Sequence, residues 1–159
     1  MSQERRLRVA AYGVCIRDDE LLLSRFTGGD RPRWTLPGGG MDHGEDPYST
    51  VLRELAEETG YTGEVRELLG IHSWHEVRSS QHDLPDGMRR DYQGLRIVYS
   101  VQITGGELTF EQGGSTDRAE WFPLDRVPEL ERVALVDYGL DLYRDRPPDG
   151  HPRREHREP

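Results

Sequence analysis

Residues 36–61 read LPGGGMDHGEDPYSTVLRELAEETGY and join a glycine-rich turn to one short helix. Pro47 has the fixed backbone angle that suits a first helical turn, and Asp46 before it can accept hydrogen bonds from the free amides of that turn. Gly60 stands where a left-handed cap would end the helix. The stretch therefore predicts a helix over residues 47–59, and the rest of the chain is expected to support it.

At about 100° per residue, this helix has one apolar side and one acidic side. The apolar side carries Tyr48, Val51, Leu52 and Leu55. The opposite side carries Glu54, Glu57 and Glu58. A solvated acidic surface is the ordinary meaning of such a pattern. These glutamates, however, fall in the last turns, where the helix dipole disfavours acids by roughly 0.3 to 1 kcal/mol each.

The glutamates are also spaced so that they repel one another. Glu54 stands i,i+3 to Glu57 and i,i+4 to Glu58, which brings like charges to roughly 5 to 6 Å. Each pair then costs about 3 kcal/mol at an effective dielectric constant of about 20. A divalent cation between the carboxylates reverses the sign of this interaction. Because Mg²⁺ and Mn²⁺ accept carboxylate, carbonyl and water oxygens, the spacing favours a metal site over an acidic surface.

The residues around the helix agree with this interpretation. Arg53 is the local positive charge, and one guanidinium cannot neutralise all the glutamates together with Glu45. Gly38, Gly39 and Gly40 permit backbone angles closed to other residues and let the main chain approach a ligand closely. A glycine carbonyl could therefore join the carboxylates around a cation. A tight turn without any ligand is the alternative for these glycines.

The whole stretch resembles the signature of the Nudix hydrolases. The signature begins at Gly39 and continues, after five residues, with Glu45. Seven residues further on stands Arg53-Glu54-Leu55, which is followed after one residue by Glu57-Glu58 and after one more residue by Gly60-Tyr61. Every specified position matches, with Tyr61 standing where an aliphatic residue is more usual. A match over residues 39–61 is far more specific than a lone glycine motif. The likeness extends more loosely over residues 6–144, through the strand order and the segment Trp121-Phe122-Pro123-Leu124.

The resemblance implies an α/β fold, namely an α/β/α sandwich around a mixed β-sheet. The family hydrolyses nucleoside diphosphates linked to another moiety and uses bound divalent metal, here Mg²⁺ or Mn²⁺. On this interpretation Glu54, Glu57 and Glu58 face the metal together with the carbonyl of Gly38, and Arg53 orients Glu54. Metal suits this chemistry, because it shields the phosphates, activates the attacking water and supports the leaving oxygen.

Length and composition predict one folded domain. The chain has 159 residues, and its 33% hydrophobic and 32% charged residues indicate a lean core. We expect residues 1–5 to be an N-terminal segment and residues 6–144 to be the Nudix domain. Residues 145–159 are so rich in proline and charge that we expect a disordered tail.

The net charge limits the partners of this protein. A formal charge of −9 argues against nonspecific nucleic-acid binding, which depends on clustered basic residues. We therefore expect a small phosphorylated nucleotide as substrate and no nucleic-acid partner. Cys15 is the single cysteine, which excludes an internal disulfide framework. Since no segment has the apolar length of a membrane span or a secretion signal, we expect no membrane contact and a cytoplasmic location.

Alternation and turn signals predict the elements around the motif. We expect a core strand at residues 7–16 with a hairpin partner at 21–25, and further strands at 65–77 and 95–103. Gly105 and Gly106 suggest a hairpin turn that pairs residues 107–110 with the preceding strand. A second helix is expected over residues 128–143. The polar stretch 78–94 has no periodicity, and loops of that length are usually functional or disordered.

Candidate substrate ligands precede the motif, in a loop rich in glycine, proline and arginine. Arg25, Arg31 and Arg33 are near enough in sequence to contact phosphates. Trp34 is expected either to stack on the substrate or to pack in the core. Gly39 and Gly40 are further candidates for substrate contact.

The general base is left open by the sequence. Many family members carry a glutamate three residues before the tryptophan that stands at Trp121, but this chain has Arg118 there. Glu54 is therefore our first candidate for the base. Asp117 and Glu120, which flank Arg118, are the alternatives.

Two classes of function remain at this point. One is an enzyme that cleaves the diphosphate linkage of a nucleotide, and the other is a catalytically silent Nudix-fold module that senses a nucleotide. The enzyme is favoured, because a binder need not keep repulsive acids together. We rank nucleoside triphosphates and ADP-ribose-like nucleotide sugars above dinucleoside polyphosphates, and the absence of a basic stripe argues against capped RNA. A homodimer is left open, since dimers are common in the family.

Overall fold

A computed structural model describes residues 3–78, 89–110 and 112–158 of the chain. Its elements are β1 (Gln3–Val14), β2 (Ile16–Arg17), β3 (Glu20–Phe26), β4 (Arg33–Thr35), β5 (Gly38–Gly40), α1 (Pro47–Thr59), β6 (Tyr61–Arg78), β7 (Arg89–Gly106), β8 (Thr116–Pro123), a 3-10 helix (Leu124–Glu129) and α2 (Ala134–Asp145). None of the helices described in this structure is both long and apolar enough to cross a membrane.

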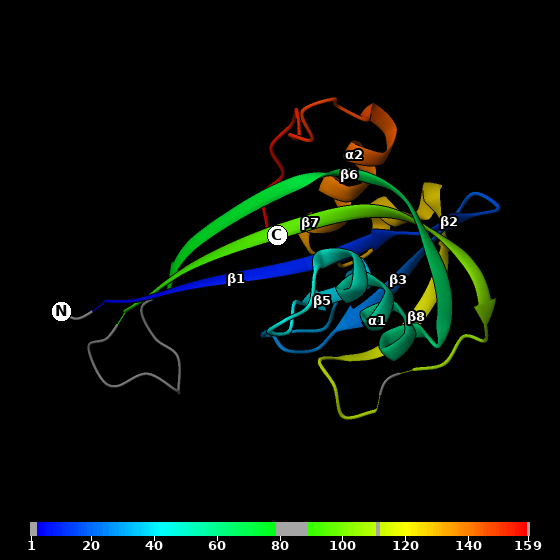
Figure 1. Cartoon of the computed structure of the whole chain (residues 1–159), viewed down its shortest axis with the longest axis horizontal. Helices are drawn as coiled ribbons and strands as arrows, with labels where there is room; N and C mark the ends of the chain where they lie inside the picture. The colour runs from blue at the N-terminus through cyan, green and yellow to red at the C-terminus, as the bar shows by residue number, and fades with distance from the viewer. Residues whose placement is uncertain (1–2, 79–88, 111, 159) are drawn as a thin grey trace.

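The strands form two four-stranded sheets, and the helices lie on different sides of them (Figure 1). The larger sheet has the order β5-β1-β7-β6. It is mixed, because β1 runs parallel to β7 whereas the β5–β1 and β7–β6 pairs are antiparallel. In the second sheet β3 pairs with β2, β4 and β8. The expected α/β fold around a mixed sheet is confirmed.

The central strand β1 supplies side chains to both layers of the core. Ala10 and Val14 belong to one buried cluster with Leu135 of α2. Ala11, on the opposite face of the strand, belongs to a second cluster with Val51 of α1. Since successive strand residues point to opposite faces, a strand covered by a helix on each side must be apolar at every position. This explains the unbroken apolar run in the middle of β1.

Helix α1 begins and ends where the sequence predicts. The Asp46 carboxylate accepts a hydrogen bond from the Ser49 amide at 2.7 Å, and Pro47 occupies the first turn. Gly60 adopts a left-handed φ of 76° and its amide donates to the carbonyl of Ala56. Helix α2 starts at Ala134, later than predicted, because Pro128 lies in the preceding 3-10 helix.

The predicted strand pairing needs correction near the N-terminus. We expected residues 21–25 to form a hairpin with residues 7–16, but β1 pairs with β5 and β7 instead. The chain leaves the larger sheet at Cys15, and only the short β2 pairs with β3. Residues 3–5, expected to precede the domain, are part of β1 and pair with β7.

Two further expectations about strands were wrong. Residues 107–110 form no strand, because Gly106 turns the chain with a φ of 83° and the segment then crosses the end of α1. Residues 89–94, which we assigned to a polar loop, belong to β7 and pair with both β1 and β6. The remainder of that loop, residues 79–88, lies outside the described residues.

The C-terminal segment is ordered against the domain, contrary to the expectation of a disordered tail. The carbonyl of Gly150 accepts a hydrogen bond from the Ile71 amide of β6 at 2.8 Å. The Tyr138 hydroxyl of α2 donates to the Glu155 carboxylate, and His156 lies 2.6 Å from the carboxylate of Asp141. The segment therefore has hydrogen-bond partners on α2 and β6, which composition alone cannot reveal.

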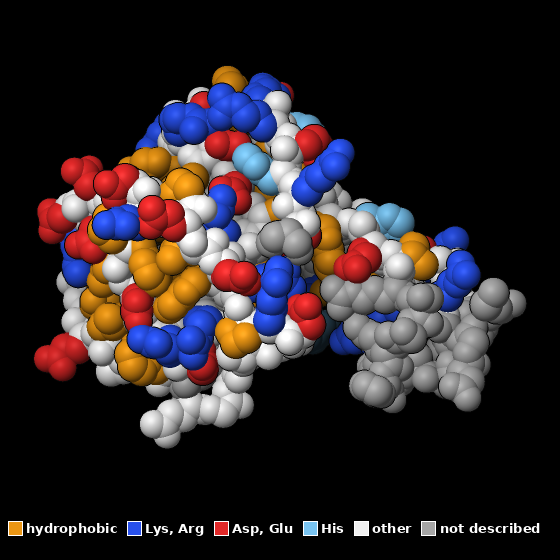
Figure 2. Space-filling view, turned by 180° about the vertical axis from the view of Figure 1, so that it is seen from behind, with side chains coloured by type: hydrophobic (Ala, Val, Ile, Leu, Met, Phe, Trp, Pro, Cys, Tyr) orange, Lys and Arg blue, Asp and Glu red, His pale blue; other side chains and the backbone are white. Residues whose placement is uncertain are grey.

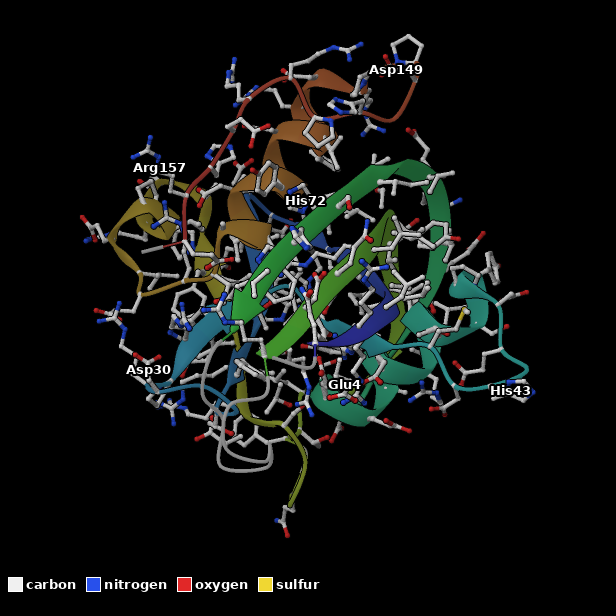
Figure 3. All side chains as sticks on the ribbon, turned by 90° about the vertical axis from the view of Figure 1, so that its left-hand side faces the viewer. Glu4, Asp30, His43, His72, Asp149 and Arg157 are labelled. Atoms are coloured by element: carbon white, nitrogen blue, oxygen red, sulfur yellow. The ribbon has the colours of Figure 1, made fainter. Side chains whose placement is uncertain are left out.

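His72 lies on the side of β6 that faces α2 (Figure 3). Its ring stacks on Tyr138 with 3.8 Å between the centroids. Burial lowers the pKa of His72 from 6.5 to about 4, and the positive charge of Arg96 acts in the same direction. The folded protein therefore favours neutral His72, while the unfolded chain binds a proton at higher pH.

We expect this histidine to make folding stability depend on pH between about 6.5 and 4. As pH falls through this window, the unfolded chain takes up the proton first, so the free energy of unfolding decreases by about 1 to 2 kcal/mol after allowance for solvent screening. The variant His72→Phe keeps the stack and should lose this part of the dependence. Urea unfolding at several pH values measures the difference, and parallel curves for both proteins would contradict the assignment.

Candidate functional site

The glycine turn of β5 lies directly on the helix α1. Gly38 has a φ of 149°, and a side chain there would collide with the carbonyl oxygen of Ala11. A Cβ on Gly39 would lie 2.7 Å from the Glu54 carboxylate, well inside contact distance. Gly38 therefore cannot carry a side chain, whereas a side chain at Gly39 would require the Glu54 carboxylate to move.

Arg53 ties this turn to the carboxylates. Its Nε donates to Glu45 at 2.5 Å, and its Nη1 donates to Glu54 at 3.1 Å and to Glu57 at 3.2 Å. Its Nη2 donates to the carbonyl of Gly40 at 3.1 Å. One guanidinium thus holds three acids and the backbone of the turn in a single arrangement, which its planar set of donors makes feasible.

The ion pair between Glu45 and Arg53 persists at low pH. Hydrogen bonds from Arg53 and Thr50 lower the pKa of Glu45 to about 2. The carboxylates of Glu45 and Glu54 in turn raise the pKa of Arg53 above its usual value. The ion pair of Glu45 and Arg53 therefore remains charged throughout the range in which proteins normally work.

Glu58 forms the base of the site inside the protein. It is 2% exposed, and its carboxylate accepts hydrogen bonds from the Ser24 hydroxyl of β3 and from the Gly38 amide, each at 3.1 Å. A buried acid needs such donors, because an unpaired polar group in the core is costly. The contacts connect α1 to both sheets, since Ser24 and Gly38 belong to different sheets.

The donor set suits a hard divalent cation. Glu54, Glu57 and Glu58 supply carboxylate oxygens, and the Glu57 side chain is 48% exposed. In residues 3–78, 89–110 and 112–158, however, no group of three or more His, Cys, Asp or Glu side chains is arranged to hold a metal ion. Glu54 and Glu57 accept hydrogen bonds from Arg53, and Glu58 accepts one from Ser24. Ligation by these residues and by the Gly38 carbonyl stays a prediction.

The candidates Arg25 and Asp117 are paired with each other. Arg25 donates to both carboxylate oxygens of Asp117, at 2.9 and 2.5 Å. This contact lowers the pKa of Asp117, which makes the carboxylate a weaker base. Arg31, a further candidate, forms an ion pair with Glu131 at 3.2 Å.

Glu120, the other alternative base, lies on the far face of the second sheet. It stands opposite Leu23 in the β3–β8 pair, next to the Ser24–Ala119 pair. Because neighbouring strand positions point to opposite faces, Glu120 lies on the side away from the Ser24 hydroxyl. Its carboxylate accepts a hydrogen bond from Arg118. Among the three candidate bases, Glu54 is the one that touches the glycine turn.

Trp34 packs in the core, which was one of the two roles predicted for it. Its ring meets Phe122 edge-on with 4.7 Å between the centroids. Its amide donates to the carbonyl of Glu131, and its carbonyl accepts from the amide of Val133. Arg33 beside it forms ion pairs with Asp30 at 3.6 Å and with Glu158 at 3.7 Å.

Sequence reasoning missed one arginine beside the turn. Arg8 of β1 lies next to Gly40, where a Cβ would be 3.2 Å from its Nη2. Its Nη1 is 3.5 Å from the hydroxyl of Tyr12. Strand alternation could have found it, because Arg8, Ala10 and Tyr12 share one face of β1.

The same face carries aromatic side chains that no local pattern indicates. The register aligns Arg8 with Gly94 of β7 and Gly94 with Trp74 of β6. Trp74 contacts Tyr92 with 5.0 Å between the ring centroids, and Arg96 lies 5.2 Å above the Trp74 ring. A cationic and aromatic surface therefore continues from the glycine turn along the sheet.

Comparison with known proteins agrees with this geometry. A family model described as the NUDIX domain matches residues 6–140. The chain belongs to the Nudix family. An ADP-ribose pyrophosphatase from Methanocaldococcus jannaschii is 34% identical to this Nudix chain over 125 residues, which cover 77% of the chain and 65% of the relative. An RNA pyrophosphohydrolase from Azorhizobium caulinodans is 34% identical over 111 residues, which cover 61% of this chain and 62% of the relative.

Solved structures support the fold. A NUDIX hydrolase from Nitrosomonas europaea superposes with a TM-score of 0.69 at 24% identity, covering 93% of this chain and 94% of that one. At this level of identity the likeness concerns the fold alone. The Nudix chain therefore has a family and a fold, while its substrate must be argued from the site.

We expect Ser24→Ala to destabilise this Nudix domain, because it removes a donor from the buried Glu58 carboxylate. The free energy of unfolding should fall by about 1 to 3 kcal/mol, the usual effect of leaving a buried group with one partner fewer. Ser49→Ala, on the exposed side of α1, is the matched control and should change it by less than about 0.5 kcal/mol. Equal stability of both variants in urea unfolding would contradict the buried contact.

Proposed function

We propose that this Nudix domain is a metal-dependent hydrolase that cleaves the diphosphate linkage of a nucleotide by attack of water on phosphorus. The observation that carries the proposal is the contact of the glycine turn with the Glu54 carboxylate, held by the hydrogen bonds of Arg53. A protein that only senses nucleotides needs no such concentration of acids. A substrate whose phosphates meet carboxylates needs cations between them.

Each residue of the site has a separate role in the proposed reaction. Glu54, Glu57 and Glu58 would hold Mg²⁺ or Mn²⁺, which when bound shields the phosphates and lowers the pKa of the attacking water. Arg53 orients Glu54 and Glu57 through one guanidinium nitrogen. Glu54 is the base that we propose, because it lies against the turn while Asp117 is neutralised by Arg25. Gly39 and Gly40 let the substrate approach the backbone.

A small nucleotide is the substrate class that the surface supports best. Arginine side chains lie among aspartates and glutamates over the face drawn in Figure 2. Beside the turn, Arg8 offers a charge for a phosphate, and Trp74 with Tyr92 offers rings for a base. Nucleoside triphosphates and ADP-ribose-like sugars fit these groups, and one relative is named an ADP-ribose pyrophosphatase.

The proposal is tested by phosphate release from a panel of nucleotides with Mg²⁺ or Mn²⁺. We expect turnover by the wild type and a decrease of at least about 100-fold in Glu57→Gln and Glu58→Gln, which corresponds to about 2.7 kcal/mol of transition-state stabilisation. The exposed Glu64 of β6 provides the matched control, so Glu64→Gln should keep wild-type turnover.

Three other results of this assay would contradict the proposal or part of it. Turnover that is unchanged in Glu57→Gln and Glu58→Gln would show that these residues are not the site. Nucleotide binding without turnover, with metal present, would support the sensing module instead. Activity confined to RNA 5′ ends would refute the ranking of small nucleotides.

Arg8 should affect substrate binding more than the chemical step. We expect Arg8→Gln to raise KM about five- to tenfold for the best nucleotide, with kcat changed less than about twofold, because the lost contact is present in both the ground state and the transition state. Arg6→Gln, further along the same strand, is the control and should leave KM near the wild-type value. A large loss of kcat in Arg8→Gln would contradict this role.

A further inference from the structure

Glu58 differs from the exposed glutamate beside it in what holds it. Glu57 accepts a hydrogen bond from Arg53, a long and flexible side chain, and is itself 48% exposed. Glu58 is 2% exposed and accepts hydrogen bonds from the Ser24 hydroxyl and the Gly38 amide. Uncharged donors of the protein interior therefore hold this carboxylate.

Both of these donors meet the same oxygen of Glu58. The Ser24 Oγ and the Gly38 nitrogen each lie 3.1 Å from Glu58 Oε2. The last torsion of a glutamate side chain is broad, so a carboxylate with a single hydrogen bond can still turn. A second donor on the same oxygen restricts this rotation, because each hydrogen bond weakens steeply when it bends. The two donors together thus determine which way the carboxylate faces.

The two donors also stand on firmly paired parts of the fold. Ser24 lies in the central strand of the second sheet, where it pairs with Thr35 of β4 and with Ala119 of β8. Gly38 pairs with Tyr12 of β1 in the larger sheet. Side chains on strands are placed more precisely than side chains on loops. The carboxylate is therefore fixed from two sheets at once, with α1 beside both of them (Figure 1).

Ser24 is a polar residue in an otherwise apolar part of β3. Leu22 and Leu23 precede it, and all three residues are 0% exposed. A hydroxyl buried at such a place costs free energy unless it has a partner, and the Glu58 carboxylate is that partner. The contact with this carboxylate therefore explains why a serine stands in the middle of the sheet.

We propose that Ser24 is a positioning residue of the metal site, which sets the affinity for Mg²⁺ or Mn²⁺ by keeping the Glu58 carboxylate ordered. The inference rests on the proposed metal-dependent hydrolysis. Loss of a hydrogen-bond partner behind a metal ligand typically lowers metal affinity or activity about 10- to 100-fold. In this role Ser24 acts through Glu58 and does not contact the metal itself.

Electron paramagnetic resonance of Mn²⁺ measures this affinity without turnover, because the sharp signal of free Mn²⁺ is lost on binding. We expect Ser24→Ala to bind Mn²⁺ about tenfold more weakly than the wild type. Ser24→Thr keeps a hydroxyl and should bind within about threefold of the wild type. At saturating Mn²⁺, kcat of Ser24→Ala should stay within about threefold of the wild-type value, since the affinity and not the chemical step is impaired.

A matched control separates this role from a general loss of stability. Val51 of α1 is 1% exposed and packs in the core cluster that contains Ala11 of β1. Val51→Ala should lower the free energy of unfolding by an amount comparable to Ser24→Ala, because it leaves a cavity, but should keep wild-type Mn²⁺ affinity. Circular dichroism and thermal melting show whether each variant is folded during the measurement. Equal weakening of Mn²⁺ binding in both variants would mean that Ser24 is structural only, which overturns the proposal.

A double-mutant cycle identifies the carboxylate through which Ser24 acts. Added to Glu58→Ala, the change Ser24→Ala should weaken Mn²⁺ binding by less than a further factor of about two, because the hydroxyl has already lost its partner. Added to Glu57→Ala, it should cost its full factor of about ten, since Glu57 lies outside the contact. Equal further losses in both backgrounds would contradict the assignment to Glu58.

The same measurements distinguish this inference from the proposed function. A wild-type protein that takes up no Mn²⁺ would contradict the metal dependence of the hydrolysis, and the role of Ser24 would be refuted with it. Mn²⁺ uptake by the wild type with unchanged affinity in folded Ser24→Ala would overturn the role of Ser24 alone and leave the proposed hydrolysis intact.

Discussion

The structure depends on one arrangement, the close approach of the glycine turn to the acidic end of α1. A side chain at Gly39 would displace the Glu54 carboxylate, and a side chain at Gly38 would collide with the backbone of β1. The acids of this helix repel one another and the helix dipole, so they need a positive partner. Arg53 is that partner in the folded chain, and it binds the turn at the same time. The site and the fold thus share the same contacts.

The strand β1 connects this site to the rest of the molecule. It pairs with β5, which carries the turn, and with β7 in the middle of the larger sheet. Its two faces contribute to separate core clusters under α1 and α2. A change in the register of β1 would therefore displace the turn from the carboxylates and both clusters at once. This dependence gives a reason for the unbroken apolar sequence at its centre.

Predictions from local sequence succeeded where the physical cause is local. Asp46, Pro47 and Gly60 act within one turn of the helix end, and α1 has the predicted bounds. The disordered tail was a wrong prediction, because composition cannot show that Tyr138 and Asp141 provide hydrogen-bond partners for it. The hairpin of β1 with β3 was wrong for a similar reason, since adjacent strands in sequence joined different sheets. The roles of the site residues toward metal and substrate remain predictions.

The sequence by itself determined the Nudix motif, the helix that carries it and the acids on one side of that helix, because these follow from spacing over a few residues. Only the tertiary structure decided which distant groups meet it. Ser24 reaches Glu58 from another sheet, and Arg8 reaches Gly40 from β1. The alignment of Arg8 with Gly94 and Trp74 also exists only through the pairing of β1, β6 and β7. Strand register sets such contacts, and register depends on the packing of the whole sheet rather than on any one segment.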